Sequence, residues 1–210
     1  MTVSKTYFEK VLDQLRDIGL LHLSGDEIPS VRELLTGRRS KGSWWADPAA
    51  QKIFNVNQAL EDHPDVTIVK LISKKVTFVH RKLWLALLSA SAARDEWQVK
   101  NLSKPAQLLL NEIDKDGTLF TNSVKRSFAT KIGDAARDLE LRLLIHSDQF
   151  HTESGAHAKR LETWEAWAKR VNLKGRRLNS IDARYLLEKH LDAINQTYSG
   201  RGRLPWTSSR

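Results

Sequence analysis

The chain has 210 residues, of which 40% are hydrophobic, so it can fold as one large domain or two small ones and is not a disordered protein. It contains no cysteine, which excludes disulfides, thiolate metal sites and a cysteine nucleophile. The formal net charge of +9 favours a polyanionic partner, nucleic acid before an anionic membrane surface. Plain solubility is the alternative reason for such a charge.

Nothing in the sequence predicts export or membrane insertion. The opening stretch MTVSKTYFEKVLDQ lacks the apolar core of a signal peptide. No run approaches the roughly 20 apolar residues that a membrane span needs. We therefore expect a cytoplasmic protein with no membrane partner.

The first half predicts three helices, then a β-hairpin, then another helix. Asp47 is a good N-cap with Pro48 at the first helical position. After His63-Pro64 the pattern changes to β-branched runs, with Ser73-Lys74 as a tight turn. LLHLSGDEIPS and RDEWQVKN are expected to be connections. The expected helices are 5–18, a short one from Pro29 or Ser30 to Leu35, 48–62 and 81–93, and the strands are 66–72 and 75–80.

The second half repeats this order. Ser103 caps a helix that has Pro105 just inside it and that ends at the sequence DKDG. The other expected helices are 121–129, 132–143, 163–170 and 180–197, and the strands are 143–151 and 156–162 around a turn at 153–155. The last segment, YSGRGRLPWTSSR, is expected to be a flexible basic tail in which Trp206 is exposed or docked on a partner.

Three helices followed by a hairpin are the element order of a winged helix, in which the hairpin is the wing. The sequence therefore predicts a mainly α protein with two β-hairpins (α+β), arranged as tandem winged-helix-like domains plus a C-terminal helix and a basic tail. The expected boundaries are 1–97 and 98–170 for the two domains and 171–210 for the helix and tail.

The second predicted hairpin carries His151 and His157 on either side of its tip, and Lys159 and Arg160 follow. Two imidazoles with Glu153 could in principle bind zinc, but a defined zinc site would want three or four ligands whose orientation is fixed by supporting hydrogen bonds. Ordinary polar hairpin residues are a second interpretation. The third is a wing whose His151, His157, Lys159 and Arg160 approach phosphates.

The third helix of each half would read bases if the modules bind DNA conventionally. In the first half its outward stripe is Gln51, Lys52, Asn55 and Gln58, and Asn and Gln can make bidentate contacts to adenine. Ordinary helix surface is the alternative. In the second half the outward residues mix bases with acids, which is more typical of a solvated face: Lys131, Asp134, Arg137, Asp138 and Arg142.

The stretch GRRSKGSWW places Arg38, Arg39 and Lys41 beside Trp44 and Trp45. Basic residues next to tryptophan would suit a stacking site for an unpaired base. Hydrophobic core is the competing interpretation of this tryptophan pair. Four other tryptophans lie at helical apolar positions and are expected to pack inside: Trp84, Trp97, Trp164 and Trp167.

Further phosphate contacts are expected from Arg176, Arg177, Arg201 and Arg203.

Three motifs resemble a family of bacterial proteins: GSWWADPAAQKIF at 42–54, VTIVKLISKKVTFVHRKLW at 66–84 and LELRLLIHSDQFHTESGAHAKRLETWEAW at 139–167. The second half is also similar to the winged-helix modules of AlkZ/YcaQ-type DNA glycosylases, which unhook alkylated or crosslinked bases with tandem winged helices. Those enzymes use a Gln-apolar-Gln or Gln-apolar-Asp motif, and this chain has neither. The resemblance therefore implies tandem winged helices on DNA, and it does not extend to base excision.

These observations favour a non-catalytic protein that binds double-stranded DNA in a regulatory or repair-associated role. The common phosphate-binding, zinc-protease and serine-hydrolase motifs are absent, so no catalytic residue, metal or cofactor is expected. Two alternatives stay open. One is a repair enzyme related to AlkZ, and the other is a protein-interaction module built on winged helices. A protein partner or a homodimer is also left open.

Overall fold

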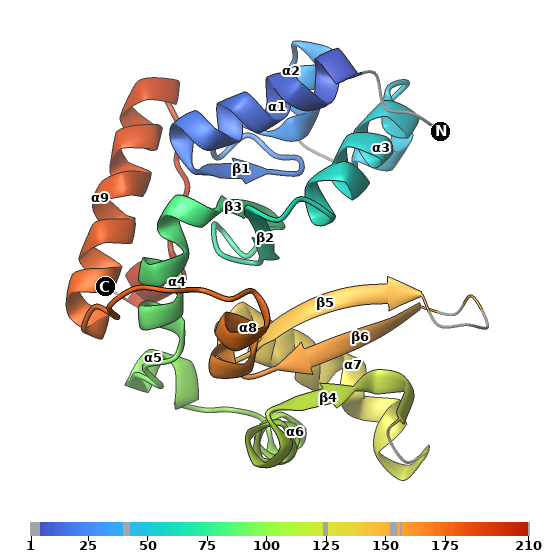
Figure 1. Ribbon diagram of the computed structural model, residues 1–210, viewed down its shortest axis with the longest axis vertical. Helices are drawn as coiled ribbons and strands as arrows, with labels where there is room; N and C mark the ends of the chain where they lie inside the picture. The colour runs from blue at the N-terminus through green and yellow to red at the C-terminus, as the bar shows by residue number, and fades with distance from the viewer. Residues whose placement is uncertain (1–4, 40–42, 124–125, 152–154, 156, 210) are drawn as a thin grey trace. The chain divides into compact units, whose positions relative to one another are not determined.

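The chain folds into two compact units, each with helices and one small sheet (Figure 1). The first unit combines residues up to 84 with residues 184–208, and the second spans 85–183. Helices dominate and both sheets are three-stranded and antiparallel, which confirms the expected mainly α class with two hairpins. In the described part of the chain, no helix is long and apolar enough to span a membrane. The computed structural model describes residues 5–39, 43–123, 126–151, 155 and 157–209.

The first unit places three helices against a sheet of order β1-β3-β2. Helix α2 begins directly after Ser30, close to the expected start. Ser30 caps it, because its Oγ accepts the Glu33 N–H at 3.1 Å. The turn at Ser73 and Lys74 also forms, with positive φ at both residues. The elements are α1 (Lys5–Ile18), β1 (Leu20–His22), α2 (Val31–Thr36), a 3₁₀ turn (Trp44–Ala46), α3 (Ala50–Glu61), β2 (Val66–Val69), β3 (Thr77–His80) and a second 3₁₀ turn (Arg81–Leu83).

Two expectations for the first unit are wrong. Residues 20–22, expected to be a connection, form strand β1, which pairs with β3. A strand of three residues is too short to show a period of its own. Asp47 does not cap α3, which begins at Ala50. Its carboxylate instead accepts the Ala49 N–H at 2.9 Å and pairs with Arg32, so it closes the turn before the helix.

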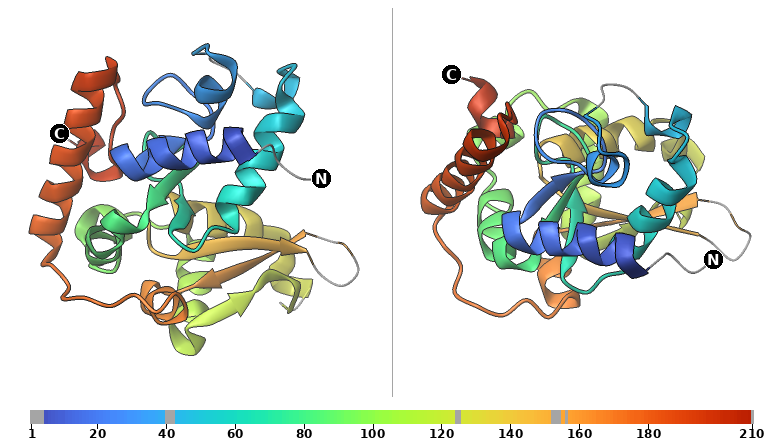
Figure 2. Two further views of the ribbon diagram at one scale, coloured as in Figure 1. Left: turned by 45° about the horizontal axis from the view of Figure 1, so that its top comes forward. Right: turned by 90° about the horizontal axis from the view of Figure 1, so that it is seen from above.

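The basic C-terminal segment is not a flexible tail. After α9 (Ser180–Tyr198) the chain turns back into the first unit and ends in a 3₁₀ turn (Pro205–Ser209). Figures 1 and 2 show α9 beside the end of α1, where the His190 Nε2 lies 2.6 Å from the Ile18 carbonyl. Trp206 is 9% exposed and donates to Glu188 at 2.7 Å. The predicted flexibility is wrong because apolar residues of this segment pack in the core of the first unit.

The second unit holds the other sheet, of order β4-β6-β5, and its core lies between α6, α7 and that sheet. Ser103 caps α6 and Gly117 ends it with φ of 74°, both as expected. Its elements are α4 (Trp84–Ser91), α5 (Glu96–Val99), α6 (Lys104–Asp116), β4 (Thr118–Phe120), a 3₁₀ turn (Thr121–Ser123), α7 (Arg126–Leu141), β5 (His146–His151), β6 (His157–Glu162) and α8 (Trp164–Arg170).

The sequence misplaced some elements of the second unit. The helices expected at 121–129 and 132–143 are one helix, α7, which continues through Gly133. Strand β4 and helix α5 were not expected. Helix α5 forms because Asp95 and Gln98 make a capping box at its start. The expected packing of Trp84, Trp164 and Trp167 is confirmed, since each is 1% exposed.

Candidate nucleic-acid interface and a charged cluster

The turn before α3 is fixed by polar contacts. The Arg32 guanidinium lies 2.8 Å from the Asp47 carboxylate, and both side chains are nearly buried. The Ala49 N–H and then Arg32 hold the pKa of Asp47 below its ordinary value. At the start of the turn, the Ser43 Oγ accepts the Trp45 N–H at 3.3 Å. These contacts give residues 43–49 one defined conformation.

Trp44 and Trp45 have different environments. Their rings stack with centroids 3.8 Å apart and an interplanar angle of 25°. Trp44 is buried in the first unit, whereas Trp45 is 66% exposed. Phe54 of α3 lies 6.2 Å from the Trp45 ring in a tilted arrangement. The core interpretation therefore holds for Trp44, while Trp45 is part of the surface at the beginning of α3.

Helix α3 presents amide side chains away from its core stripe of Ile53, Val56 and Leu60. The Gln51 Nε2 donates to the Asn55 Oδ1 at 2.9 Å, so these two side chains are held side by side. Gln51 and Gln58 are exposed and Asn55 is partly exposed. We call the residues Trp45, Gln51, Lys52, Asn55 and Gln58 the α3 surface. Lys52 sits at its edge, with Nζ 4.0 Å from the centroid of the Tyr7 ring.

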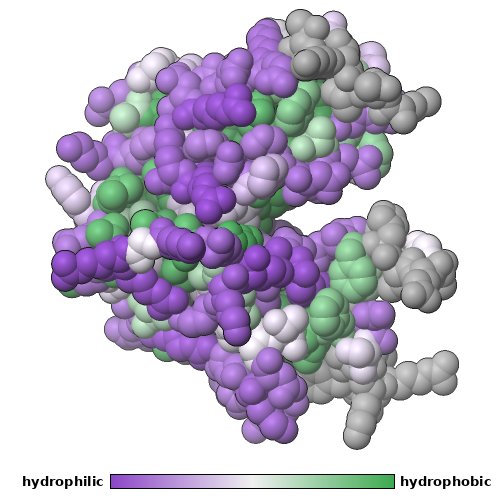
Figure 3. Space-filling model, viewed as in Figure 1, coloured by the Kyte–Doolittle hydropathy of each residue, from purple (hydrophilic) through white to green (hydrophobic). Residues whose placement is uncertain are grey.

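The basic residues of the first unit are placed differently from one another. Arg38 is exposed directly after α2, and Lys41 lies outside the described residues. Arg39 bonds to Glu33 at 2.8 Å and to the Tyr198 carbonyl at 2.7 Å. Arg201 lies 3.4 Å from Asp26, and Arg203 is exposed. The face of the molecule drawn in Figure 3 is mainly hydrophilic, with hydrophobic side chains gathered in small patches.

The basic residues predicted for the second unit mostly have carboxylate partners. Lys159 pairs with the buried Glu140, and Arg160 lies 2.7 Å from Asp148. Arg177 lies 3.2 Å from Glu165, and Arg176 is exposed. The backbones of His151 and His157 are paired at the ends of β5 and β6, but their side chains, like Glu153, lie outside the described part. The predicted site residues therefore fall into two groups, one in each unit.

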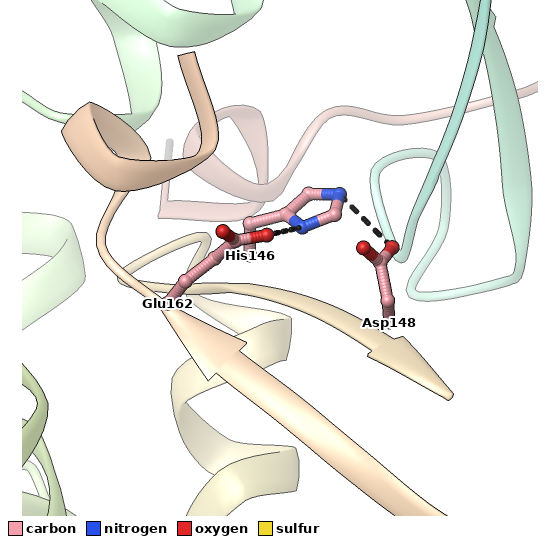
Figure 4. Close-up of side chains that lie close together, drawn as sticks. All are labelled: His146, Asp148 and Glu162. Atoms are coloured by element: carbon pink, nitrogen blue, oxygen red, sulfur yellow. Dashed lines mark hydrogen bonds and ion pairs between the residues drawn. The ribbon is translucent and has the colours of Figure 1, made fainter. Parts of the chain in front are cut away.

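A charged cluster that the sequence did not predict lies at the other end of this hairpin (Figure 4). His146 has no exposed side-chain surface, and its Nδ1 lies 3.1 Å from Glu162 across the strand pair. Its ring stacks on Trp167 at 5.4 Å. The Arg170 Nε lies 3.1 and 3.2 Å from the two Glu162 oxygens, and Arg170 also reaches Asp148 at 2.6 Å.

The cluster has the ligand types of a metal site but is balanced by arginines. Ligand atoms of His146, Asp148 and Glu162 lie within 4.8 Å of one another. Burial acts to raise the pKa of Glu162, but the hydrogen bonds from His146 and Arg170 outweigh it and bring the pKa to about 2. Arg160 and Arg170 already supply the positive charge that a metal would. We therefore interpret the cluster as an ion network that joins β5, β6 and α8.

The only sequence signal for this cluster is that side chains alternate between the two faces of each strand. His146 and Asp148 are two residues apart on β5, as are Arg160 and Glu162 on β6, so each pair shares a face. The antiparallel register sets His146 opposite Glu162 and Asp148 opposite Arg160. That register depends on where the hairpin turns, which the sequence gives only to within a few residues. Arg170 lies on the following helix, and its spacing in the sequence does not indicate that it joins the cluster.

The model of a family described as AlkZ related matches residues 5–201, nearly the whole chain. A search of curated proteins found no match, and neither did a search of solved structures.

Proposed function

This chain belongs to the AlkZ-related family, and we propose that it is a non-catalytic, repair-associated protein that binds double-stranded DNA through winged-helix modules. The family supports the repair context, and the positive net charge supports a polyanionic partner. The α3 surface of the first unit is the proposed site of base contact. Arg38 and Arg39 are the proposed phosphate contacts beside it, with Lys41 in the same loop.

The order of elements supports the winged-helix assignment. In each unit a strand follows one long helix, α1 or α6, and a hairpin follows the next long helix, α3 or α7. The three strands of each unit form one antiparallel sheet. In a winged helix, the helix directly before the hairpin enters the major groove. That helix is α3 in the first unit and α7 in the second. The hairpins β2–β3 and β5–β6 would be the wings.

The observation that carries the proposal is the row of amide side chains on α3. Gln51, Asn55 and Gln58 are spaced at i, i+4 and i+7, so they follow one face of the helix. They leave the apolar stripe of α3 free to pack in the core. Amide side chains in the major groove pair with adenine through its N6 and N7 atoms. An amide row with few charges suits base contact, because strong charge would favour phosphates instead.

The second unit supports a non-catalytic role. In its charged cluster, His146 is buried and Glu162 is bonded to His146 and Arg170. A general acid or base must reach the substrate and exchange a proton with it. A carboxylate whose pKa is about 2 holds protons too weakly for that task at neutral pH. The cluster is better suited to holding the sheet together.

Substitution of the amide row tests the proposal. A preferred duplex is first selected from a random pool with the full chain, and affinities are then compared by fluorescence anisotropy. Asn55→Ala should weaken binding to that duplex by about 1–3 kcal/mol if one base contact is lost. Gln196→Ala removes an exposed amide from α9 of the same unit and should leave the affinity unchanged. Equal affinities of both variants and the unaltered protein would refute base contact by α3.

Family membership also favours a second candidate function, an enzyme that releases alkylated bases. Incubation of the protein with alkylated duplex DNA, followed by chromatography of the supernatant, distinguishes the two. The proposed function predicts that no free base appears while binding persists. Release of a modified base above the spontaneous rate would establish the enzyme instead.

A further inference from the structure

We propose that Trp45 stacks on an unpaired base, so that the protein prefers DNA in which a base is unpaired or lacks its partner. This inference rests on the proposed function and adds to it the class of DNA that is recognised. It concerns the first unit alone. The argument uses the exposure of Trp45, the way it is held and the chemistry of its neighbours.

The exposure of Trp45 sets it apart from other tryptophans of the chain. It is 66% exposed, whereas Trp84, Trp164 and Trp167 are each 1% exposed. Because its ring stacks on Trp44 at 3.8 Å, one face is covered and the exposed area belongs to the rest of the ring. A large aromatic ring kept in water costs free energy that burial would recover. A binding partner that covers the ring recovers it on contact.

The ring is held in place before any partner arrives. The Trp44 ring stacks on one of its faces, and the centroid of the Phe54 ring lies 6.2 Å from its own centroid. The backbone of the turn is held by Ser43 at one end and by the nearly buried pair of Arg32 and Asp47 at the other. A side chain fixed in its bound orientation loses little conformational entropy on binding. An exposed ring on a mobile loop would lose more.

The surroundings of the ring favour a nucleobase over an apolar protein surface. Beyond Ala46 and the two rings against it, Trp44 and Phe54, nearby residues of the chain are polar. They are Ser43 and Asp47, and the amide row of α3 begins at Gln51. The charge of Arg38 helps to lower the pKa of Asp47, so this cation lies near the carboxyl that closes the turn of Trp45. A flat aromatic ring beside a cation and amide groups matches a base with its phosphate. A protein partner would require a wider apolar patch than one ring provides.

Only an unpaired base can use this ring as a stacking partner. In an intact duplex each base is covered above and below by its neighbours, and its faces are inaccessible. A bulged base, or the base opposite an abasic position, has no pairing partner. Such a base can expose one of its faces at little cost in free energy. The position of Trp45 at the beginning of α3 would place the ring beside the bases that the amide row contacts.

The test compares three duplexes of one sequence: fully matched, with a single-base bulge, and with an abasic position. Affinities of the full chain are measured by anisotropy with each labelled duplex at fixed salt. We expect the bulged and abasic duplexes to bind roughly 5- to 150-fold more tightly than the matched one, the range for stacking of one base on an aromatic ring.

Variants assign the preference to the ring. Trp45→Ala should reduce the ratio of the affinities for the bulged and matched duplexes to within about twofold of one, while matched duplex still binds. Trp45→Phe should keep part of the preference. Tyr185→Ala is the matched control, because Tyr185 is an aromatic residue of the same unit with the same exposure of 66%. It should keep the full preference.

Each outcome decides the inference. Equal binding of the matched and bulged duplexes by the unaltered protein, or an unchanged preference in Trp45→Ala, would overturn it and leave the proposed function standing. An equal loss of affinity for all duplexes in Trp45→Ala would make the ring a general contact and also overturn it. No binding of any duplex would refute the proposed function itself, and a protein partner for this surface would then be sought.

Discussion

His22 is a fully buried histidine on strand β1, and this burial keeps it neutral. Its Nε2 lies 3.1 Å from the Ile72 carbonyl, which can only accept, so the ring proton is on that nitrogen. Glu27 lies 3.7 Å from the Nδ1 but is itself bonded to Lys75. Burial lowers the pKa of His22 to about 4, and the charge of Glu27 offsets only part of that effect.

This burial predicts a loss of stability in mild acid. The folded-state pKa of about 4 is below the ordinary value of 6.5, so the unfolded chain binds the proton first as the pH falls. The contribution of His22 is complete above pH 6.5 and decreases by ~3 kcal/mol as the pH falls to about 4. Urea unfolding of His22→Gln should therefore depend less on pH in this window than unfolding of the unaltered protein. His63→Gln, at a partly exposed position, is the control. Identical pH profiles for the unaltered protein and the His22 variant would contradict the account.

Glu162 shows the same sign in a lower pH range. Its pKa of about 2 is below the ordinary 4.5, so its contribution is present above pH 4.5 and is lost as the pH falls toward 2. Glu162→Gln leaves Arg170 without its buried partner. It should lower the unfolding free energy at pH 7 by about 3 kcal/mol, the low end for a buried pair, because Arg170 is partly exposed and keeps Asp148. Glu165→Gln removes the exposed partner of Arg177 and should leave the stability nearly unchanged. A Glu162→Gln protein as stable as the Glu165→Gln protein would mean that the cluster is not structural.

At the scale of elements, α7 shows why one helix was predicted as two. The predicted break fell at residues 130 and 131, but the helix continues there and through Gly133, because Ile132, Ala136 and Leu139 pack into the core of the second unit. A Cβ at Gly133 would meet nothing within 4 Å. Gly133→Ala should therefore stabilise the protein by about 0.5–1 kcal/mol in urea unfolding. Gly117→Ala is the contrasting control, because its φ of 74° disfavours alanine and it should destabilise. Destabilisation by Gly133→Ala would show that the glycine has a further role.

Elements with strong local signals were predictable. Helices α1, α2, α6, α8 and α9 and both hairpins agree closely with the sequence patterns. Strands β1 and β4 were not predicted, because three residues cannot show a period and their pairing with β3 and β6 is decided by long-range contacts. Asp47 has the sequence features of an N-cap, but Arg32, 15 residues earlier, pairs with it and closes a turn instead.

The residues of the candidate site could be predicted from the sequence. Their burial and their interaction partners could not. The amide row on α3 follows from helical spacing. Trp44 and Trp45 are adjacent in sequence, and only the fold shows that one is buried and the other exposed. The partners of Lys159 and Arg160 are Glu140 and Asp148, and neither pairing has a local signature. Whether Lys159 and Arg160 contact DNA depends on whether they leave these carboxylates.

At the scale of the whole molecule, the return of the C-terminal segment completes the first unit. The Arg201 N–H donates to the Glu27 carbonyl, and the Ser73 N–H donates to the Arg203 carbonyl, both at 2.8 Å. Gly202 is needed because a Cβ there would lie 2.8 Å from carbons of Ile28 and Ile72. The segment also supplies core residues: Leu187, Leu191, Ile194, Leu204 and Trp206.

Removal of residues 184–210 should therefore unfold the first unit while the second stays folded, since 85–183 form that unit. Five core side chains would be lost, each worth about 1.5–3 kcal/mol of burial, which exceeds the stability of a small domain. Hydrogen exchange should show loss of protection in α1 and β3 and retention in α6 and α7. Retained protection in α1 would contradict a structural role for the segment.

Salt-dependent binding to duplex DNA tests the central claim most directly. Anisotropy of a labelled random duplex is measured between ~50 and ~200 mM salt with the full chain and with Arg38→Ala. The account predicts that log affinity falls linearly with log salt, and that Arg38→Ala makes the slope shallower by about 0.9, one phosphate contact. Absence of binding at the lowest salt would contradict the account and leave the net charge of +9 as an aid to solubility.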